Sequence, residues 1–430
     1  MTDWQFVGAW RGGTVSSVAV SADFESDGIA LAATGAGIYR TMDHGKQWQR
    51  TITGFTDVSA VAITFAPDNR GAQPIAFASA ETGRLYRSAD GGMTWSEMIT
   101  WAGLGLVTAI ALSPDYANDK TIFVGTPNGV YRSFDDGVGW EEASFGLLDL
   151  EILCLTCAPD FAESGVLWVG TALGGFYRSR NRGLAWRESG VGLPDAAIQC
   201  MAVVPRAGNA PTLFVGTESD GVYRSDNQGA LWERAGDALA GLSVNALALS
   251  QDEQGALLVA GTNEGIYYAT VTQERGDETW HAAANGDLLA FAMAATQART
   301  MLAATFQESL AFSTDAGRSW QRTGAELAGH TPPLLFPTAT GSIYALDTDG
   351  AVAVSQDDGA TWSPLPVNDE LSVITTLAVS EDPAAPLLYA ATEQALLRHV
   401  TTGVEWEPLP LPTTNVTHVV LSPGPATDQQ

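Results

Sequence analysis

Basic side chains are scarce in this sequence, and long hydrophobic runs are missing. Its 430 residues hold 21 Lys and Arg, with Lys46 and Lys120 as the two lysines, against 49 Asp and Glu, so the formal net charge is −28. The electric field of so negative a protein repels a phosphate backbone, which argues against nucleic-acid binding. Basic proteins, metal cations and neutral ligands remain as possible partners. No apolar run reaches the ~18–20 residues that cross a bilayer, so the sequence predicts no membrane span. It also shows no basic segment followed by an apolar one at its start, which predicts a soluble, cytoplasmic protein.

Cysteine is scarce as well, with three residues in the whole chain. Three cysteines cannot form a disulfide framework for a chain of this length. Cys154 and Cys157 have the CxxC spacing of some metal and redox sites. They lie, however, in an alternating strand pattern, where residues three apart point to opposite faces. We therefore expect small apolar core residues and predict no metal site here.

One ten-residue segment recurs along the chain. It reads YRSADGGMTW at 86–95 and YRSFDDGVGW at 131–140, and degenerate copies end at Trp280 and Trp406. From Trp48 to Trp406 the copies are spaced by about 45 residues, which predicts nine repeats.

Each repeat reads as four short strands, here termed A to D. In the third repeat they fall at 107–112, 121–125, 129–133 and near Trp140, and Gly, Asp, Asn or Pro lies between them. Four strands in ~45 residues are typical of a propeller blade. The sequence thus predicts an all-β fold, a single β-propeller of four-stranded antiparallel blades over 1–422, with a flexible tail at 423–430.

Nine blades are the expected count, with eight and ten as alternatives. A lone strand D at 4–7 and a lone strand A at 416–421 would give a stunted tenth blade, whereas loss of a weak repeat would leave eight.

The recurring motif is Ser/Thr-x-Asp/Asn-x-Gly-x-x-Trp, and through it residues 4–422 resemble the Asp-box (BNR-repeat) β-propellers. That superfamily includes sialidases, xyloglucan-active glycosidases, sortilin-type receptors and photosystem II assembly factors. The resemblance implies a turn between strands C and D on the outer rim, away from any active site. In such a turn the Asp or Asn side chain accepts backbone N–H groups, Gly adopts positive φ and Trp packs on the blade. The residues expected in this structural role are Asp43, Asp90, Asp135, Asn181, Asn227, Asp315, Asp357, Trp48, Trp95, Trp140, Trp186, Trp232, Trp320 and Trp362.

Arginines end strand C in six repeats, at Arg40, Arg87, Arg132, Arg178, Arg224 and Arg398. They could form an anion-binding arc. In five of these repeats strand A ends at an aspartate, namely Asp23, Asp68, Asp115, Asp160 and Asp382. Because strands A and C run in the same direction, we favour structural pairing of these acids with the arginines. The repeat of Arg224 lacks the acid.

The D–A and B–C loops share the opposite face and are rich in acids. The candidate partner-binding residues there are Asp57, Glu81, Asp149, Glu151, Asp195, Glu218, Asp220, Glu264, Asp287, Glu308, Asp347, Asp349, Asp369, Glu370 and Glu393. They are either solvated loop acids or a negative surface that attracts a basic protein or a cation. Asp347 and Asp349 could help to bind Ca²⁺, but two carboxylates are too few to define a site, so no cofactor is predicted.

Strand A is expected to line the central channel. One register carries Ser16, Thr108, Leu153, Gln199, Asn245, Thr375 and Thr417. These residues include no carboxylate, His or Cys, so the channel lacks acid–base groups and suits water or a small polar ligand. Trp10 and Trp101, in D–A loops, are the candidate aromatics for a sugar.

Function follows from which catalytic sets are present. A sialidase would need an arginine triad, a Tyr nucleophile and a Phe/Tyr-Arg-Ile-Pro motif, and the motif is absent. The xyloglucan-type enzymes have two propellers around a cleft, where one is expected here, and we name no catalytic residue. The sequence therefore predicts a non-catalytic protein-interaction scaffold or adaptor that uses the acidic loop face. The alternatives are a glycan-binding module and an inverting glycoside hydrolase, which needs two carboxyls ~6.5–9.5 Å apart.

Overall fold

The computed structural model describes most of the first three quarters of the chain and shorter stretches after it. The described residues are 15–51, 53–67, 73–98, 105–206, 210–252, 255–272, 278–284, 289–295, 299–305, 309–323, 334–337, 343–346, 352–356, 363–365, 374–379, 387–392, 395–400 and 406–409. The chain divides into two compact units, which are taken separately. The seven-sheet unit is Gly12–Ala328, and the two-sheet unit is Met1–Arg11 with Gly329–Gln430.

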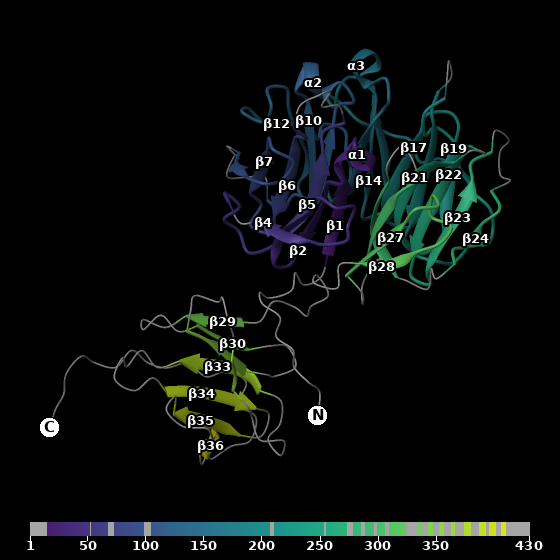
Figure 1. Ribbon diagram of the computed structural model, residues 1–430. Coiled ribbons are helices and arrows are strands. Elements are labelled where there is room, and N and C mark those ends of the chain that lie inside the picture. The colour runs from purple at the N-terminus through teal and green to yellow at the C-terminus, as the bar shows by residue number, and fades with distance from the viewer. Residues whose placement is uncertain are drawn as a thin grey trace. The chain divides into compact units, whose positions relative to one another are not determined.

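The seven-sheet unit holds sheets 1 to 7, each of four antiparallel strands hydrogen-bonded in chain order (Figure 1). Sheet 1 contains β1 (Val15–Val20), β2 (Ala30–Thr34), β3 (Gly37–Thr41) and β4 (Gln49–Thr51). Sheet 2 contains β5 (Ala60–Phe65), β6 (Ala76–Ala80), β7 (Leu85–Ser88) and β8 (Ser96–Glu97). Sheet 3 contains β9 (Ala109–Leu112), β10 (Ile122–Thr126), β11 (Gly129–Ser133) and β12 (Glu141–Glu142). Sheet 4 contains β13 (Ile152–Cys157), β14 (Leu167–Thr171), β15 (Phe176–Ser179) and β16 (Arg187–Glu188). Sheet 5 contains β17 (Ile198–Val204), β18 (Thr212–Thr217), β19 (Val222–Ser225) and β20 (Glu233–Arg234). Sheet 6 contains β21 (Val244–Asp252), β22 (Gly255–Thr262), β23 (Ile266–Thr270) and β24 (His281–Ala282). Sheet 7 contains β25 (Ala290–Ala295), β26 (Met301–Thr305), β27 (Ser309–Ser313) and β28 (Gln321–Thr323).

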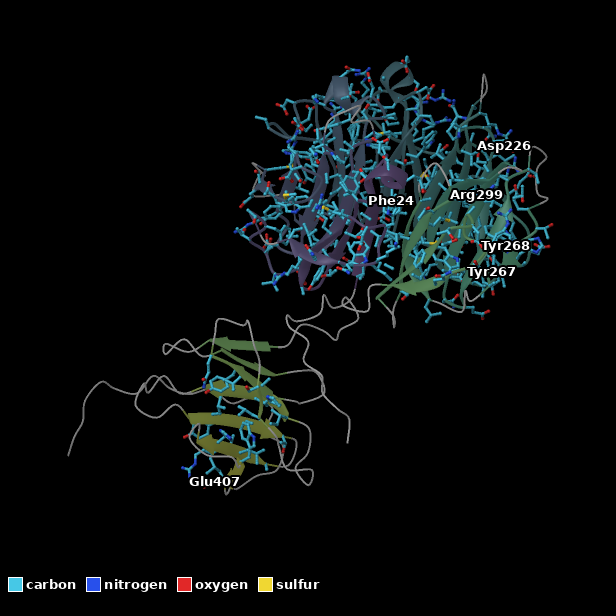
Figure 2. The ribbon with its side chains drawn as sticks, viewed as in Figure 1. Phe24, Asp226, Tyr267, Tyr268, Arg299 and Glu407 are labelled. Carbon is cyan, nitrogen blue, oxygen red and sulfur yellow. The ribbon has the colours of Figure 1, made fainter. Side chains whose placement is uncertain are left out.

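Three short helices connect strands A and B in sheets 1, 3 and 4. They are α1 (Phe24–Asp27), α2 (Tyr116–Asp119) and α3 (Phe161–Ser164). The aromatic residue that begins each helix is buried, as is Phe24, which Figure 2 labels. Phe161 meets Phe123 of sheet 3 edge to face, with ring centroids 5.6 Å apart, so this helix links two sheets.

The seven sheets close into a ring. Each inner strand contacts the next, from β1 through β5, β9, β13, β17 and β21 to β25, and β25 contacts β1 again. At the closure, Phe24 and Trp48 of sheet 1 share a buried core with Leu302 and Leu310 of sheet 7. Figure 1 shows these purple and green ends of the unit side by side. The β-propeller fold is therefore confirmed, and its ring has seven sheets.

The two-sheet unit contains the last two repeats. Sheet 8 holds β29 (Leu334–Pro337), β30 (Ile343–Leu346), β31 (Val352–Ser355) and β32 (Ser363–Leu365). Sheet 9 holds β33 (Ile374–Val379), β34 (Leu387–Thr392), β35 (Leu396–Val400) and β36 (Trp406–Leu409). Their shared core includes Tyr344, Leu388 and Trp406.

Among the described residues, nine repeats thus give nine four-stranded sheets, as the spacing predicts, and sheets 1 to 7 close into the ring of the seven-sheet unit. Ring size depends on the wedge angle that interface side chains set between neighbouring sheets, and the repeat period carries no record of that angle. The predicted lone strands at 4–7 and 416–421 and the tail at 423–430 lie outside the described residues. Among the residues the structure describes, no helix is long and apolar enough to span a membrane.

Candidate interaction surface

The turns between strands C and D use the motif residues to fix their own backbone. In sheet 3, Ser133 Oγ donates to Asp135 Oδ1 at 2.8 Å, and the N–H groups of Gly137 and Gly139 donate to Ser133 Oγ and Asp135 Oδ1 at 2.9 and 2.8 Å. The same pattern recurs at Asp43, Asp90, Asn181, Asn227 and Asp315. Side chains whose oxygens are used in this way serve the turn itself. Asp357 and Trp362 lie outside the described residues.

The tryptophans of these turns tie neighbouring sheets together. Trp186 Nε1 donates to Ala143 O of the preceding sheet at 2.6 Å, and Trp232 Nε1 donates to Ser189 O at 3.0 Å. Trp95 Nε1 donates to Thr51 Oγ1 of sheet 1 at 3.2 Å. In the remaining described turns, the indole N–H donates to the glycine carbonyl of its own turn, at Trp48, Trp140 and Trp320.

The strand-C arginines also link sheets, but through partners that the sequence does not predict. Arg40 Nε donates to Gly91 O at 2.7 Å, and Arg178 Nη1 donates to Gln228 O at 3.1 Å. Each acceptor is a backbone carbonyl in the C–D turn of the next sheet. Arg132 donates in the same way to the carbonyl of Arg182.

The structural interpretation of these arginines is therefore supported, whereas the three described aspartates, Asp23, Asp115 and Asp160, are not the partners of Arg40, Arg132 and Arg178. Asp23, Asp115 and Asp160 instead immediately precede the three short helices. Arg87 pairs with Asp136 in the next turn at 3.1 Å. Asp68 and Asp382 lie outside the described residues, and Arg398 pairs with Glu407 of β36 at 2.7 Å.

Arg224, the arginine whose repeat lacks the strand-A acid, lies in a buried charged cluster. It contacts Glu278, and the two side chains are 3% and 0% exposed. It also contacts Asp226, labelled in Figure 2, at 3.1 Å, and Arg206 lies 3.2 Å from the same carboxylate. Glu278 Oε2 has no hydrogen-bond partner. Glu278 belongs to the degenerate repeat that ends at Trp280. Its carboxylate accepts from Arg224, where in other sheets the acceptor of the arginine is a backbone carbonyl of the next C–D turn.

The CxxC cysteines point into different cores, as predicted. Cys154 packs against the core shared by sheets 4 and 5, whereas Cys157 belongs to the core shared by sheets 3 and 4. Burial raises the pKa of the Cys154 thiol to about 12 and also raises that of Cys157. Within the described residues, no group of three or more His, Cys, Asp or Glu side chains could hold a metal ion.

Strand-A side chains in the predicted channel register largely bond to the protein itself. Ser16 Oγ donates to Ala60 O of sheet 2 at 2.9 Å, and Thr108 Oγ1 donates to Ile152 O of sheet 4 at 2.8 Å. Ser243 Oγ lies 3.0 Å from Asn245 Oδ1 and 3.4 Å from Gln199 Oε1, which places three polar groups together. Leu153 is partly buried, the side chain of Thr375 is not described, and Thr417 lies outside the described residues.

Several of the predicted loop acids hold the loops in place. Asp57 accepts hydrogen bonds from the hydroxyls of Tyr86 at 2.5 Å and Thr82 at 2.8 Å. Asp220 accepts from Tyr223 at 2.6 Å and forms an ion pair with Arg234 at 2.8 Å. These carboxylates have partners within the chain.

Asp149 has the same role. It accepts the N–H groups of Leu173 at 2.8 Å and Glu151 at 3.1 Å. Burial would raise its pKa, but hydrogen bonds from Thr171 and these two N–H groups outweigh burial and lower it. Glu81 accepts from Ser59 at 2.8 Å.

Four of the predicted acids are exposed on consecutive sheets. They are Glu151, Asp195, Glu218 and Glu264, on the loops of sheets 4, 5 and 6. These loops, at 144–151, 172–175, 189–197, 218–221, 235–243 and 263–265, contain no Lys, Arg or His. The remaining candidates lie outside the described residues, namely Trp10, Trp101, Asp287, Glu308, Asp347, Asp349, Asp369, Glu370 and Glu393.

Sequence reasoning missed the apolar part of this face. Leu148, Leu150 and Leu173 are exposed on the loops of sheet 4. The available signal was the run FGLLDLE at 145–151, which has more large apolar residues than a solvated loop needs.

The shifted carboxyl pKa values in the described part of the chain all move in one direction. Each carboxyl whose pKa departs from its usual value is shifted downward, at Asp43, Asp90, Asp135, Asp149, Asp226 and Asp315. An inverting glycosidase needs one carboxyl held protonated, with a raised pKa.

Known proteins resemble this chain in structure and not in sequence. No protein-family model matches it, and no curated protein sequence matches it. PorZ, a surface component of the type-IX secretion system of Porphyromonas gingivalis, is 12% identical with a TM-score of 0.59, over 91% of this chain and 51% of PorZ. The GH74 xyloglucanase of Xanthomonas campestris is 14% identical with a TM-score of 0.58, over 94% of this chain and 75% of that enzyme.

A third similar structure is the extracellular domain of BT4673 from B. thetaiotaomicron. It is 13% identical with a TM-score of 0.53, and this chain, 94% of which is matched, spans 53% of its length. At such identities the likeness concerns the fold alone. Four-stranded antiparallel sheets, a closed ring and these neighbours together establish a β-propeller-type fold.

Proposed function

We propose that the chain is a non-catalytic protein-interaction module of the Asp-box type, which docks a basic partner protein on the D–A/B–C loop face of the seven-sheet ring. The observation that carries the proposal is the set of exposed acids Glu151, Asp195, Glu218 and Glu264 on loops that have no basic side chain. Such a one-sided charge speeds encounter with a basic surface and disfavours acidic partners.

The loops that present these acids are held in place before any partner arrives. Asp149 binds two N–H groups of its own and the neighbouring loop, and Asp220 is fixed by Tyr223 and Arg234. A partner therefore does not have to order them, which removes one cost of association. This arrangement suits a rigid binding platform.

The Asp-box assignment is supported by the turn geometry. Six described turns place the Ser or Thr, the Asp or Asn and the Gly in one repeated hydrogen-bond pattern. In each turn the Ser or Thr oxygen accepts the N–H of the glycine.

The test is affinity capture by the full chain from its native lysate at ~50 mM and ~300 mM salt, with partners identified by mass spectrometry. We expect a stoichiometric basic protein that is lost at the higher salt. The variant Glu151→Lys/Asp195→Lys/Glu218→Lys should lose it. The matched control Asp23→Lys/Glu25→Lys/Glu163→Lys changes the net charge equally at exposed positions in the A–B connections, at the opposite ends of the strands, and should keep it.

Capture that survives the loop reversal, or that the control abolishes equally, would reject the proposal. A glycan-binding role is the alternative, and a glycan array tests it. Xyloglucan oligosaccharides belong on that array because a xyloglucanase is among the similar structures.

A further inference from the structure

Three leucines form an exposed apolar patch on the loop face of sheet 4. Leu148 is 83% exposed, Leu173 is 77% exposed and Leu150 is 42% exposed. We call these three residues the leucine patch. An exposed leucine alone needs no explanation, but several together on one surface commonly mark a binding site.

Hydrogen bonds bring the members of the leucine patch together from two loops. Asp149, between Leu148 and Leu150, accepts the N–H of Leu173 at 2.8 Å. The N–H of Ala172 donates to Glu151 O at 3.0 Å. The two loops are therefore joined at two points, which hold the backbone of Leu173 beside that of Asp149 and Glu151.

The surface continues from the leucine patch to the exposed acids of sheet 5. Gly174 packs so closely on Ala196 that a Cβ at Gly174 would lie 3.1 Å from its backbone. The N–H of Glu218 donates to Ala197 O at 3.0 Å. Leu173, Asp195 and Glu218 thus lie along one continuous line of loops.

The chemistry of a complementary partner follows from this line. Its apolar centre is bordered by the exposed carboxylates of Glu151, Asp195 and Glu218, and the described D–A and B–C loops of sheets 4 to 6 contain no basic residue. Acidic peptides and anionic lipid surfaces are repelled by such a border. A partner segment with bulky apolar side chains beside Lys or Arg complements both the leucine patch and the carboxylates around it.

We propose that the leucine patch receives the apolar side chains of a partner segment whose flanking lysines or arginines meet Glu151, Asp195 and Glu218. This inference rests on the proposed function and adds the apolar centre and the sequence chemistry of the partner. The leucines contribute to affinity because binding removes their apolar surface from water. The acids supply the rate of encounter and the discrimination.

The test is a selection from a random 12-residue peptide library displayed on phage, panned against the full chain. We expect the bound pool to be enriched in Leu, Ile or Phe next to Lys or Arg. Synthetic peptides from that pool should bind Leu148→Ser/Leu173→Ser at least tenfold more weakly than they bind the unchanged chain. The control Met93→Ser/Leu184→Ser removes two exposed apolar side chains from the C–D turns of sheets 2 and 4 and should leave binding unchanged.

The possible failures are distinguishable. A pool without the paired apolar and basic residues, or peptides that bind the leucine variant as tightly as the unchanged chain, would overturn this inference. If the salt-sensitive lysate partner were still captured by the leucine variant, the proposed function would stand and the apolar centre would be rejected. If the lysate gave no salt-sensitive partner and the library gave no enriched pool, both would fall.

Discussion

Removing one member of the buried Arg224–Glu278 pair should destabilise the seven-sheet unit severely. The two side chains are 3% and 0% exposed, Arg224 contacts Glu278 Oε1, and Glu278 Oε2 has no hydrogen-bond partner. Arg224→Met keeps most of the side-chain volume but leaves a buried carboxylate without its cation. Breaking such a pair costs about 3–5 kcal/mol of unfolding free energy.

The measurement is urea unfolding of the full chain, followed by tryptophan fluorescence, with the midpoint and the slope fitted separately. Trp280, two residues from Glu278, donates to Ala235 O at 2.6 Å and is one of the 13 tryptophans that contribute to the signal. Because the neighbouring Asp226 keeps Arg206 at 3.2 Å, we attribute most of the expected loss to Glu278.

A double-mutant cycle decides whether the pair is the cause. Arg224→Met/Glu278→Leu removes both charges, so it should be more stable than Arg224→Met alone by ~1 kcal/mol or more. Arg398→Met, at the exposed pair with Glu407, is the control and should leave stability nearly unchanged. A loss below ~1 kcal/mol for Arg224→Met, or strictly additive effects in the cycle, would refute the reasoning.

Three further predictions concern the turns, a glycine and the thiols. Burial would raise the pKa of Asp90, but hydrogen bonds from Thr94 and the turn lower it. A carboxyl whose pKa is lower in the folded than in the unfolded chain stabilises the fold above the unfolded pKa. That stabilisation is lost as the pH falls through the folded pKa. The melting temperature of Asp90→Asn should therefore fall less steeply than that of the unchanged chain when the pH is lowered below about 4. Gly146→Ala should lower the urea midpoint more than Gly241→Ala. Both glycines have positive φ, but a Cβ at Gly146 would lie 2.4 Å from a backbone oxygen, whereas a Cβ at Gly241 would meet no atom. Equal losses for the two variants would contradict this. Iodoacetamide should not label Cys154 in the native chain at about pH 8, because burial raises the pKa of this thiol to about 12 and leaves little thiolate to react. Labelling of the native chain, detected by mass spectrometry, would count against the packing of Cys154 described above.

The sheets were predictable because their signals are local. Four apolar runs per repeat, with Gly and Asp between them, gave the strands of all nine sheets. The separate roles of Cys154 and Cys157 followed from the two-residue period of a strand, and each packs in a different core. Ring size was not predictable, because the contact of β25 with β1 joins residues far apart in sequence that carry no distinguishing motif.

The arginine partners show why residue patterns can mislead. Arg40 and Arg178 bind backbone carbonyls of the next sheet, and a carbonyl belongs to every residue type. A sequence offers only side chains as visible partners, so aspartates were chosen. The acids of the loop face were hard to predict for the opposite reason. The sequence around Asp57 indicates a solvated loop acid, but in the structure the hydroxyl of Tyr86 donates to its carboxylate.

Closure of the ring has a consequence for how the protein is made. Each described sheet is built from consecutive strands, so sheets 1 to 6 can form in order as the ribosome releases them. Sheet 1 nevertheless leaves Phe24 and Trp48 without their final apolar neighbours until Leu302 and Leu310 have been synthesised. Contacts between residues so far apart in sequence slow the final step, because the two ends must meet before the contact stabilises them. Until that step, the nascent chain exposes the apolar faces of the first and last sheets of the open ring. These are the surfaces that a chaperone would protect.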